Sequence, residues 1–285
     1  MIPKHLFYYW GNETMSWLRF ITLQSFVKLN PDWQVSLYYS NQPVNTKTWK
    51  EHNEQDFFTY KGIDYSGRLK DLGVDIIEWR DPSPRLKDIA ASHKSNFFKW
   101  HMLGTQGGIY ADLDILWTTP MDILYDFLNR NLYDTAICYQ DWVSIGLLAS
   151  EGNNRFYMDL YNQALKVYDP EHYQCVGVNS VYTLLYGEGY TRKIFNGEIL
   201  NHIRSRYPEL KVYNLPMGLL YYYNYSHLDK LFIDNLELSH FPEYVMGLHW
   251  YAGNPLSQKF NSLLTEDNYK DHGITICNIA QEILG

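Results

Sequence analysis

The sequence predicts an α/β fold, a Rossmann-like mixed sheet flanked by helices, formed by a single domain over residues 1–285. The chain opens with a strand, helix, strand pattern, which implies parallel strands joined by a helical crossover. Later apolar segments alternate between strand-like and helical periodicity. No internal repeat, low-complexity tract or Gly/Ser-rich linker divides the chain, and its apolar share of 46% is sufficient for one sizeable core.

The elements of the first half follow from apolar spacing and from residues that stop an element. An apolar run ends at Gly11, which predicts a buried strand, and the helical pattern that follows stops at Asn30 and Pro31. Gly107 and Gly108 separate a further helical segment from a strand. The expected elements are strands at 5–9 and 34–39 around a helix at 16–29, a polar segment with one helix at 41–68, a strand at 74–79, a helix at 87–104, and a strand at 109–111 that continues as an apolar segment at 115–117.

The second half is expected to extend the sheet and to cover it with further helices. Two adjacent apolar segments have the length and spacing of paired strands. The expected elements are paired strands at 135–139 and 144–149, helices at 154–168 and 179–186, and late strands at 211–215 and 245–251.

The composition restricts the partners and the compartment. A net charge of −8 argues against nucleic acid, and an anionic substrate would need a metal ion or local cations. The 26 Tyr and 9 Trp suit sugars and nucleotide bases, although compositional drift explains them equally well. The few cysteines form no disulfide framework, and the chain shows neither a signal peptide nor an apolar run of about 20 residues that could span a membrane. A cytoplasmic protein is therefore expected.

The segment that carries the chemistry is GGIYADLD, residues 107–114. Asp112 and Asp114 stand two apart at a strand end, so their side chains point the same way while the backbone stays extended. Carboxylate oxygens suit Mg²⁺ or Mn²⁺, which commonly bridge carboxylates to substrate phosphates. A sugar nucleotide leaves behind a diphosphate, whose developing charge such an ion would neutralise. Both aspartates are therefore the expected metal ligands and catalytic residues.

Three segments resemble the DXD-containing sugar-transferase family, which includes yeast-type mannosyltransferases, bacterial capsule glycosyltransferases and the catalytic domains of clostridial glucosylating toxins. They are IPKHLFYYWG at 2–11, AASHKSNFFKW at 90–100, which runs on into GGIYADLD at 107–114, and GLHWYAG at 247–253. The resemblance implies a GT-A fold in which residues 1–120 bind the nucleotide sugar and residues 121–285 face the acceptor. It also implies metal-dependent transfer from a nucleotide-sugar donor, with UDP as the preferred carrier, to a glycan or protein acceptor with retention of configuration.

The resemblance assigns roles to individual residues. Asp112 would contact the ribose and the metal shell, and Asp114 would ligate the metal directly. Trp10 would stack on the base, which agrees with an aromatic ring at a strand end before Gly11, although a lone tryptophan there also fits a core position. Other members of the matching segments complete the expected donor-binding set: Tyr9, Ser95 and Tyr110.

The second segment departs from the family pattern, which usually reads Ser-Asp-x-x-Arg. Here Asn96 and Lys99 follow Ser95, and positions three apart on a helix share a face. Compared with the family's Asp, Asn96 keeps the ability to form hydrogen bonds but lacks the negative charge. Compared with the family's Arg, Lys99 keeps the positive charge but lacks a guanidinium that can form two parallel hydrogen bonds. We expect both to contact the donor, which leaves the donor sugar open. The alternative is a solvated helix face.

The remaining candidates rest on weaker signals. His249 would complete the metal site, because neutral imidazole is a competent ligand for Mn²⁺, although a lone histidine is often structural. Lys259 would reach the diphosphate unless it is a surface lysine. Asp141, between Gln140 and Trp142 on the expected acceptor side, is the only further carboxylate we nominate as a catalytic base. The loop at 175–179 and the tyrosines at 221–223 are further candidates, the latter as an acceptor platform or a packed edge.

Two other functions are consistent with parts of the sequence. A HAD-like phosphatase also uses Asp-x-Asp after a strand, but it needs Thr or Val where this chain has Leu116, and its motif lies on the first strand. A catalytically weak module that binds a sugar nucleotide or glycan would explain Asn96 and Lys99. Asp112, Asp114 and His249 argue against that second alternative.

Overall fold

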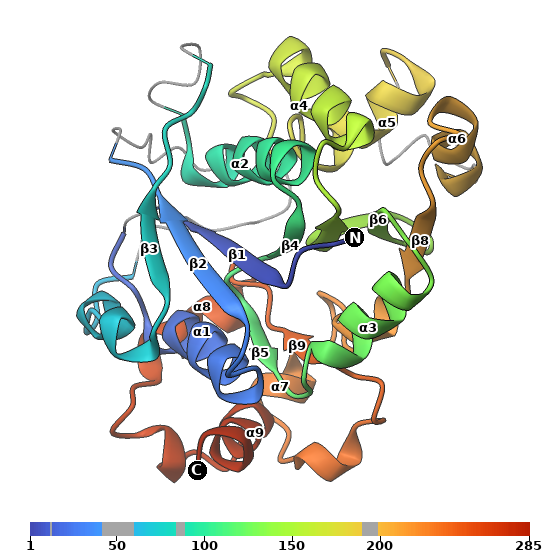
Figure 1. The fold of residues 1–285 in the computed structure, drawn as a ribbon. Helices are drawn as coiled ribbons and strands as arrows, with labels where there is room; N and C mark the ends of the chain where they lie inside the picture. The colour runs from blue at the N-terminus through green and yellow to red at the C-terminus, as the bar shows by residue number, and fades with distance from the viewer. Residues whose placement is uncertain (12, 42–59, 84–88, 190–198) are drawn as a thin grey trace.

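A computed structural model of the protein describes residues 1–11, 13–41, 60–83, 89–189 and 199–285 (Figure 1). Its main sheet has seven strands in the order β3-β2-β1-β4-β7-β6-β8, and β5 pairs with β9 in a separate sheet. The strands are β1 (His5–Trp10), β2 (Gln34–Tyr39), β3 (Asp75–Glu78), β4 (Gly108–Ala111), β5 (Ile115–Trp117), β6 (Thr135–Tyr139), β7 (Val143–Ser150), β8 (Val212–Leu215) and β9 (Gly247–His249). The helices that cover them are α1 (Trp17–Leu29), α2 (Ala91–Thr105), α3 (Asp122–Arg130), α4 (Arg155–Val167), α5 (Val178–Tyr186), α6 (Ile199–Arg206), α7 (Asp229–Phe232), α8 (Pro255–Leu263) and α9 (Thr275–Leu284).

The order of strands in the main sheet reverses at β1. The chain builds β1, β2 and β3 outward in one direction, all parallel, and then returns to place β4 on the other side of β1. β4 is parallel to β1, whereas β7 runs antiparallel to both β4 and β6. In open α/β sheets, ligands bind outside the carboxyl ends of the strands at such a switch point. The crevice between the ends of β1 and β4 is therefore where a site is expected.

Helices pack on both faces of this sheet (Figure 1), with α2 and α4 on one face and α1 and α9 on the other. Side chains along β1 alternate between the two cores, because successive residues of a strand point to opposite faces. Tyr8 belongs to the core that includes α1, and Phe7 and Tyr9 belong to the core that includes α2. The central strands β1, β2 and β4 are thus largely buried on both sides, which explains their nearly continuous apolar sequences, whereas the edge strand β3 is exposed.

Local signals fix the ends of the elements around the site. The Ser16 hydroxyl accepts from the backbone N–H of Arg19 and begins α1. Gly107 follows α2 with φ of 74°, and a Cβ there would lie 2.3 Å from the backbone nitrogen of Gly152. Gly108 has φ of 111°, and its Cβ would lie 2.8 Å from the carbonyl oxygen of His5. The glycine pair thus allows the sharp turn from α2 into β4.

The predicted fold class is confirmed, as are the parallel opening and the antiparallel pair β6 and β7. Two expectations need correction. The strand expected at 245–251 covers only Gly247–His249, because Tyr251 takes a left-handed φ of 46° that no strand allows. The apolar segment at 115–117 leaves the main sheet and pairs with β9.

Other differences concern helices. One helix is expected within residues 41–68, and most of that segment, 42–59, lies outside the described residues. After residue 60, the described chain forms a 3-10 turn at Ser66–Leu72. The helix expected at 87–104 begins at Ala91, and residues 84–88 are also outside the described part. Helices α3, α6, α7, α8 and α9 are not predicted from the sequence. Their apolar residues alternate with polar ones in short segments, which single-sequence periodicity separates poorly from loops.

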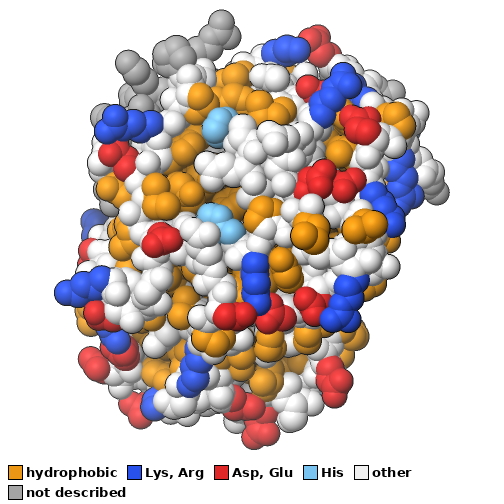
Figure 2. All heavy atoms as spheres, in the orientation of Figure 1, with side chains coloured by type: hydrophobic (Ala, Val, Ile, Leu, Met, Phe, Trp, Pro, Cys, Tyr) orange, Lys and Arg blue, Asp and Glu red, His pale blue; other side chains and the backbone are white. Residues whose placement is uncertain are grey.

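The surface gives no single charged patch on the face shown in Figure 2, where acidic and basic side chains of the described residues are interspersed. None of the helices in the described residues has the length and apolar character to cross a membrane.

Candidate metal and donor site

Asp112, Asp114 and His249 converge at the carboxyl edge of the sheet. Asp112 and Asp114 lie between β4 and β5, and His249 ends β9, where it pairs with Ile115 of β5. One ligand atom from each of the three side chains lies within 4.8 Å of the others. His249 Nε2 is 3.2 Å from Asp114 Oδ1 and 4.0 Å from Asp112 Oδ2. The pairing of β5 with β9 therefore brings the histidine to the aspartates across 135 residues of sequence.

Each carboxylate has one oxygen bound by the protein. Asp112 Oδ1 accepts from the Tyr110 hydroxyl at 2.7 Å and from the Lys99 ammonium at 3.2 Å. Asp114 Oδ2 accepts from the backbone N–H of Ala252 at 2.8 Å. Asp114 Oδ1 is buried and has no hydrogen-bond partner among the described residues. One oxygen of each aspartate thus faces His249, with Asp114 Oδ1 3.2 Å from its Nε2, and a buried carboxylate oxygen without a hydrogen bond is the kind of group a cation satisfies.

The left-handed turn at Tyr251 completes this arrangement. The backbone N–H of Trp250 donates to the Asp114 carbonyl at 2.9 Å, and the turn that follows directs the Ala252 N–H at the Asp114 carboxylate. Positive φ at an aromatic residue is strained and persists where the surrounding structure requires it. The turn therefore orients Asp114 after β9 has placed His249.

A buried lysine lies behind the aspartates. Lys99 is 2% exposed, and its ammonium also donates to the Ile145 carbonyl at 3.2 Å and lies 4.3 Å from the centre of the Tyr110 ring. Burial lowers the pKa of Lys99, and the charge of Asp112 opposes that shift. Burial acts to raise the pKa of Asp112, but Lys99, His249 and Tyr110 outweigh it and hold the pKa of that carboxyl well below its usual range. Lys99 is therefore the internal counter-ion of Asp112.

His249 is affected by the same charges. Burial acts to lower its pKa, but attraction to Asp114 and Asp112 outweighs burial, so the pKa of His249 is raised. A cation bound by the two carboxylates would replace this attraction with repulsion of the proton, as metal binding to histidine requires. The histidine therefore fits either a proton or a metal ion between the carboxylates.

The expected donor-binding residues of α2 lie beside this cluster. Ser95 lies 2.9 Å from the Tyr110 hydroxyl, which in turn donates to Asp112, so the serine supports the orientation of that hydroxyl. Asn96 is 8% exposed, and its Nδ2 would lie 3.0 Å from a Cβ added at Gly177. The alternative of a solvated helix face is thus wrong for Asn96 and for Lys99. The structure places Asn96 against the loop at 175–179, which the sequence also singles out.

Tyr9 and Trp10 lie at the end of β1, next to β4. Tyr9 is 6% and Trp10 is 7% exposed, and Tyr9 packs against the rings of Trp79 and Phe98. The indole N–H of Trp10 is buried without a hydrogen-bond partner among the described residues. Trp10 is thus a core residue that lies at the carboxyl end of β1, beside the switch point.

Two predicted residues lie outside the cluster. Asp141 is exposed in the turn between β6 and β7. Lys259 is exposed on α8, and its ammonium lies 5.8 Å from the centre of the Phe260 ring. The metal-ligand cluster includes neither of them.

Two residues of the cluster were not singled out for it from the sequence. The Gly146 carbonyl accepts from the backbone N–H of Asp112 at 2.8 Å, and the Gly146 N–H donates to the hydroxyl of Tyr221 at 3.2 Å. A glycine inside an apolar strand is a signal of close approach that could have identified Gly146. The other tyrosines of the 221–223 segment pack against Phe241, as a packed edge would.

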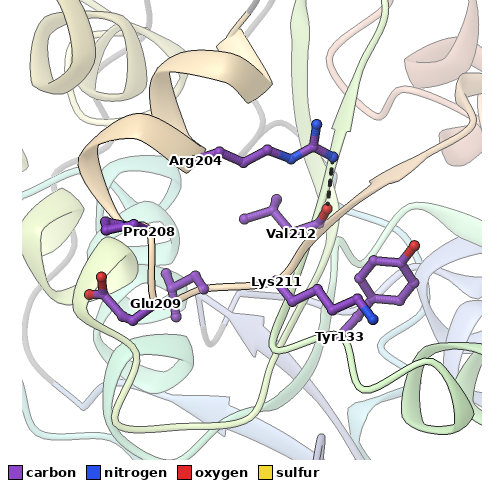
Figure 3. Close-up of a pocket in the computed structure, with 7 residues that line it drawn as sticks. Tyr133, Arg204, Pro208, Glu209, Lys211 and Val212 are labelled. Atoms are coloured by element: carbon purple, nitrogen blue, oxygen red, sulfur yellow. Dashed lines mark hydrogen bonds between the residues drawn. The ribbon is translucent and has the colours of Figure 1, made fainter.

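A separate hollow of about 470 Å³ lies at the other edge of the sheet (Figure 3). It is formed by the amino end of β8 and the segment after α6, where Arg204 donates to the Val212 carbonyl at 3.3 Å. β8 is parallel to β6, and both run in the direction of β4. The amino end of β8 is therefore at the opposite edge from Asp112, and this hollow is not part of the site.

The fold and the cluster together define an α/β protein with an Asp-Asp-His group that could hold a metal ion beside the switch point of its sheet. Residues 20–131, which include Asp112 and Asp114, match the family described as "Glycosyltransferase sugar-binding region containing DXD motif". The match covers less than half of the chain. It confirms the resemblance to DXD-containing sugar transferases and supports sugar transfer as the activity. Proteins of this type typically bind a divalent metal, for which the Asp-Asp-His cluster is suited.

Several solved glycosyltransferases are similar to this chain. PaToxG glycosyltransferase is 17% identical, with 100% of this chain and 86% of that chain covered and a TM-score of 0.45. GlyE of Streptococcus pneumoniae TIGR4 is 11% identical, with 98% and 63% covered and a TM-score of 0.44. Galactosyltransferase LgtC, solved with donor and acceptor sugar analogues, is 11% identical, with 94% and 100% covered and a TM-score of 0.44. No curated protein matches the chain.

Proposed function

We propose that this chain is a metal-dependent glycosyltransferase that moves a sugar from a nucleotide-sugar donor, UDP-linked by preference, to a glycan or protein acceptor. The observation that supports this most directly is the convergence of Asp112, Asp114 and His249 at the carboxyl edge of the sheet. In the proposed arrangement, residues 1–120 hold the donor and residues 121–285 face the acceptor. The whole of 1–285 would act as one domain, since one core contains residues of both parts.

The residues present fit a divalent cation. Two carboxylate oxygens and one imidazole nitrogen form a donor set that suits Mn²⁺ and also accepts Mg²⁺. Asp114 Oδ1 is buried without a hydrogen-bond partner among the described residues, so a bound cation would stabilise this oxygen most. When bound there, the ion would neutralise charge on the leaving diphosphate. The protein's own contribution is to hold the three ligands in place before substrate arrives.

The surrounding residues would bind the donor. Trp10 and Tyr9, at the end of β1, would hold the base, with Trp10 as the stacking surface. Ser95 and Tyr110 would keep Asp112 oriented through the hydrogen bonds that already join them. Lys259 is the exposed cation nominated for the diphosphate, and it would have to reach the site from α8.

Asn96 and Lys99 would have different roles. Lys99 is held by Asp112 and the Ile145 carbonyl, so it would act as a counter-ion that sets the position of Asp112. Asn96, nearly buried beside Gly177, would contact hydroxyls of the donor sugar. A neutral amide where the family usually has a carboxylate would favour a donor with a different pattern of hydroxyl contacts.

The stereochemical course would be retention, with the donor diphosphate helping to deprotonate the acceptor. Inversion would need a carboxylate base at the acceptor hydroxyl. Asp141 is the residue nominated for that role, and its exposed position in the β6–β7 turn leaves it outside the metal-ligand cluster. Proton NMR of the first-formed product decides between the two, because an inverted linkage contradicts retention.

A panel of sugar nucleotides, tested for hydrolysis with and without Mn²⁺, examines the proposed function directly. We expect turnover of at least one donor that disappears with excess chelator. Metal-dependent binding without any turnover would instead favour the alternative, a module that binds a sugar nucleotide or glycan.

We also propose a cytoplasmic location, which the free state of Cys138, Cys175 and Cys277 supports.

A further inference from the structure

Tyr221 is fixed beside the metal ligands by the backbone of its own segment. Its ring lies against His249, with ring centres 5.0 Å apart. The backbone N–H of His249 donates to the Leu220 carbonyl at 3.0 Å, and the N–H of Tyr221 donates to the Met217 carbonyl at 2.9 Å. The tyrosine and the histidine are thus held as a pair by their own main chains.

The hydroxyl of Tyr221 lies next to the atoms that face the cation. A Cβ added at Gly146 would be 2.5 Å from this hydroxyl, 2.9 Å from Asp112 Oδ2 and 3.4 Å from His249 Nε2. Polar atoms from three separate segments of the chain therefore surround one point, and the missing side chain of Gly146 leaves that point open. Among the three, the hydroxyl is the one with a proton to donate whether or not a cation is bound.

That proton has no acceptor within the described part of the chain. The Tyr221 hydroxyl accepts from the Gly146 N–H at 3.2 Å, which uses one lone pair of the oxygen and leaves its O–H group to donate to another acceptor. No hydrogen bond between described residues has this hydroxyl as its donor. A half-buried hydroxyl that already accepts one hydrogen bond and donates none within the described residues is suited to donate to a ligand.

We propose that Tyr221 is a substrate-contacting residue that donates its phenolic proton, as a hydrogen bond, to a phosphate oxygen of the nucleoside diphosphate beside the cation. This deepens the proposed function and rests on it. An oxygen shared between a divalent ion and a phenol is stabilised by both, and the bond is charge-assisted because the acceptor is anionic. The hydroxyl would thus help to bind the leaving diphosphate.

Tyr221→Phe tests this in the full chain, since it keeps the ring against His249 and removes one oxygen atom. Tyr222→Phe is the matched control, because the Tyr222 ring packs against Phe241. Calorimetry measures binding of UDP and of GDP in the presence of Mn²⁺, and separately of Mn²⁺ alone. We expect Tyr221→Phe to weaken the nucleotide that wild type binds by about tenfold or more, as for loss of a hydrogen bond to a charged group. Its affinity for Mn²⁺ alone, and all affinities of Tyr222→Phe, should match those of wild type.

The possible failures are distinguishable. If Tyr221→Phe binds the nucleotide as tightly as wild type, the hydroxyl only packs the site and the proposal is wrong, while the proposed function stands. If Mn²⁺ alone is weakened by the same factor as the nucleotide, the hydroxyl supports the metal site and does not contact the phosphate. If wild type binds neither UDP nor GDP with Mn²⁺, both the proposed function and the role of Tyr221 are overturned.

Discussion

The ammonium of Lys99 lies 3.2 Å from Oδ1 of Asp112, with the lysine buried to 2% exposure between α2 and β4. In the proposed site, the Asp112 carboxylate would ligate a cation. Here the same carboxylate also neutralises a buried internal charge. The stability of the site without metal therefore depends on an ion pair that involves a metal ligand.

Lys99→Met should destabilise the metal-free protein, because it leaves Asp112 partly buried without its counter-ion. Breaking such a pair costs about 3–5 kcal/mol when it is fully buried, and we expect about half of that here because the Asp112 side chain is 30% exposed. Mn²⁺ would then replace the lost positive charge and raise the melting temperature more in the variant than in wild type. Thermal unfolding with and without Mn²⁺ measures both effects. An unchanged melting temperature without metal would contradict the counter-ion role.

Asp114→Asn should remove metal binding and turnover while the protein stays folded. The amide is nearly isosteric and its oxygen still accepts from the Ala252 N–H, but it lacks the charge that a hard cation needs. Calorimetry with Mn²⁺ and a donor hydrolysis assay provide the two readouts. Asp126→Asn, on the exposed side of α3 where Asp126 pairs with Arg130, is the control and should behave as wild type. Full activity of Asp114→Asn, or of wild type in excess chelator, would rule out the metal role.

Gly146→Ala should block the site sterically. The added Cβ would fall 2.9 Å from Asp112 Oδ2 and 3.4 Å from His249 Nε2, inside the space the cation needs. The expected result is a loss of Mn²⁺ affinity of at least tenfold, with a circular dichroism spectrum like that of wild type. Gly67→Ala is the matched control, since a Cβ there meets nothing within 4 Å. If Gly146→Ala binds Mn²⁺ as wild type does, the cation lies elsewhere than between these atoms.

Trp10→Phe should weaken donor binding several-fold, because stacking of aromatic rings contributes on the order of 1 kcal/mol. Phenylalanine is used because Trp10 is only 7% exposed, and truncation to alanine would also open a core cavity. Trp33→Phe is the control, since Trp33 is equally buried but precedes β2 at the opposite edge of the sheet. Calorimetry with the donor gives the dissociation constants. Equal weakening by both substitutions would assign Trp10 to the core alone.

Much of the fold could be predicted because its signals are local. The strand, helix, strand opening, the stop at Asn30 and the glycine pair before β4 depend on neighbouring residues only, and the structure follows them. The pairing of β5 with β9 could not be predicted in this way. Three-residue strands carry almost no periodicity, and what holds them is contact between segments far apart in the sequence.

The features of the site also fall into those that the sequence predicts and those that depend on tertiary contacts. The sequence by itself determined which side chains are candidate ligands, since Asp112 and Asp114 stand together at a strand end, and it indicated Lys99 and His249 by motif position. Only the tertiary structure decided that Lys99 is buried against Asp112, that the Ala252 N–H takes one oxygen of Asp114, and that Gly146 and Tyr221 surround the remaining space. The reason is physical: ligand type is a property of side chains, whereas burial and free coordination positions arise only when distant segments pack against one another.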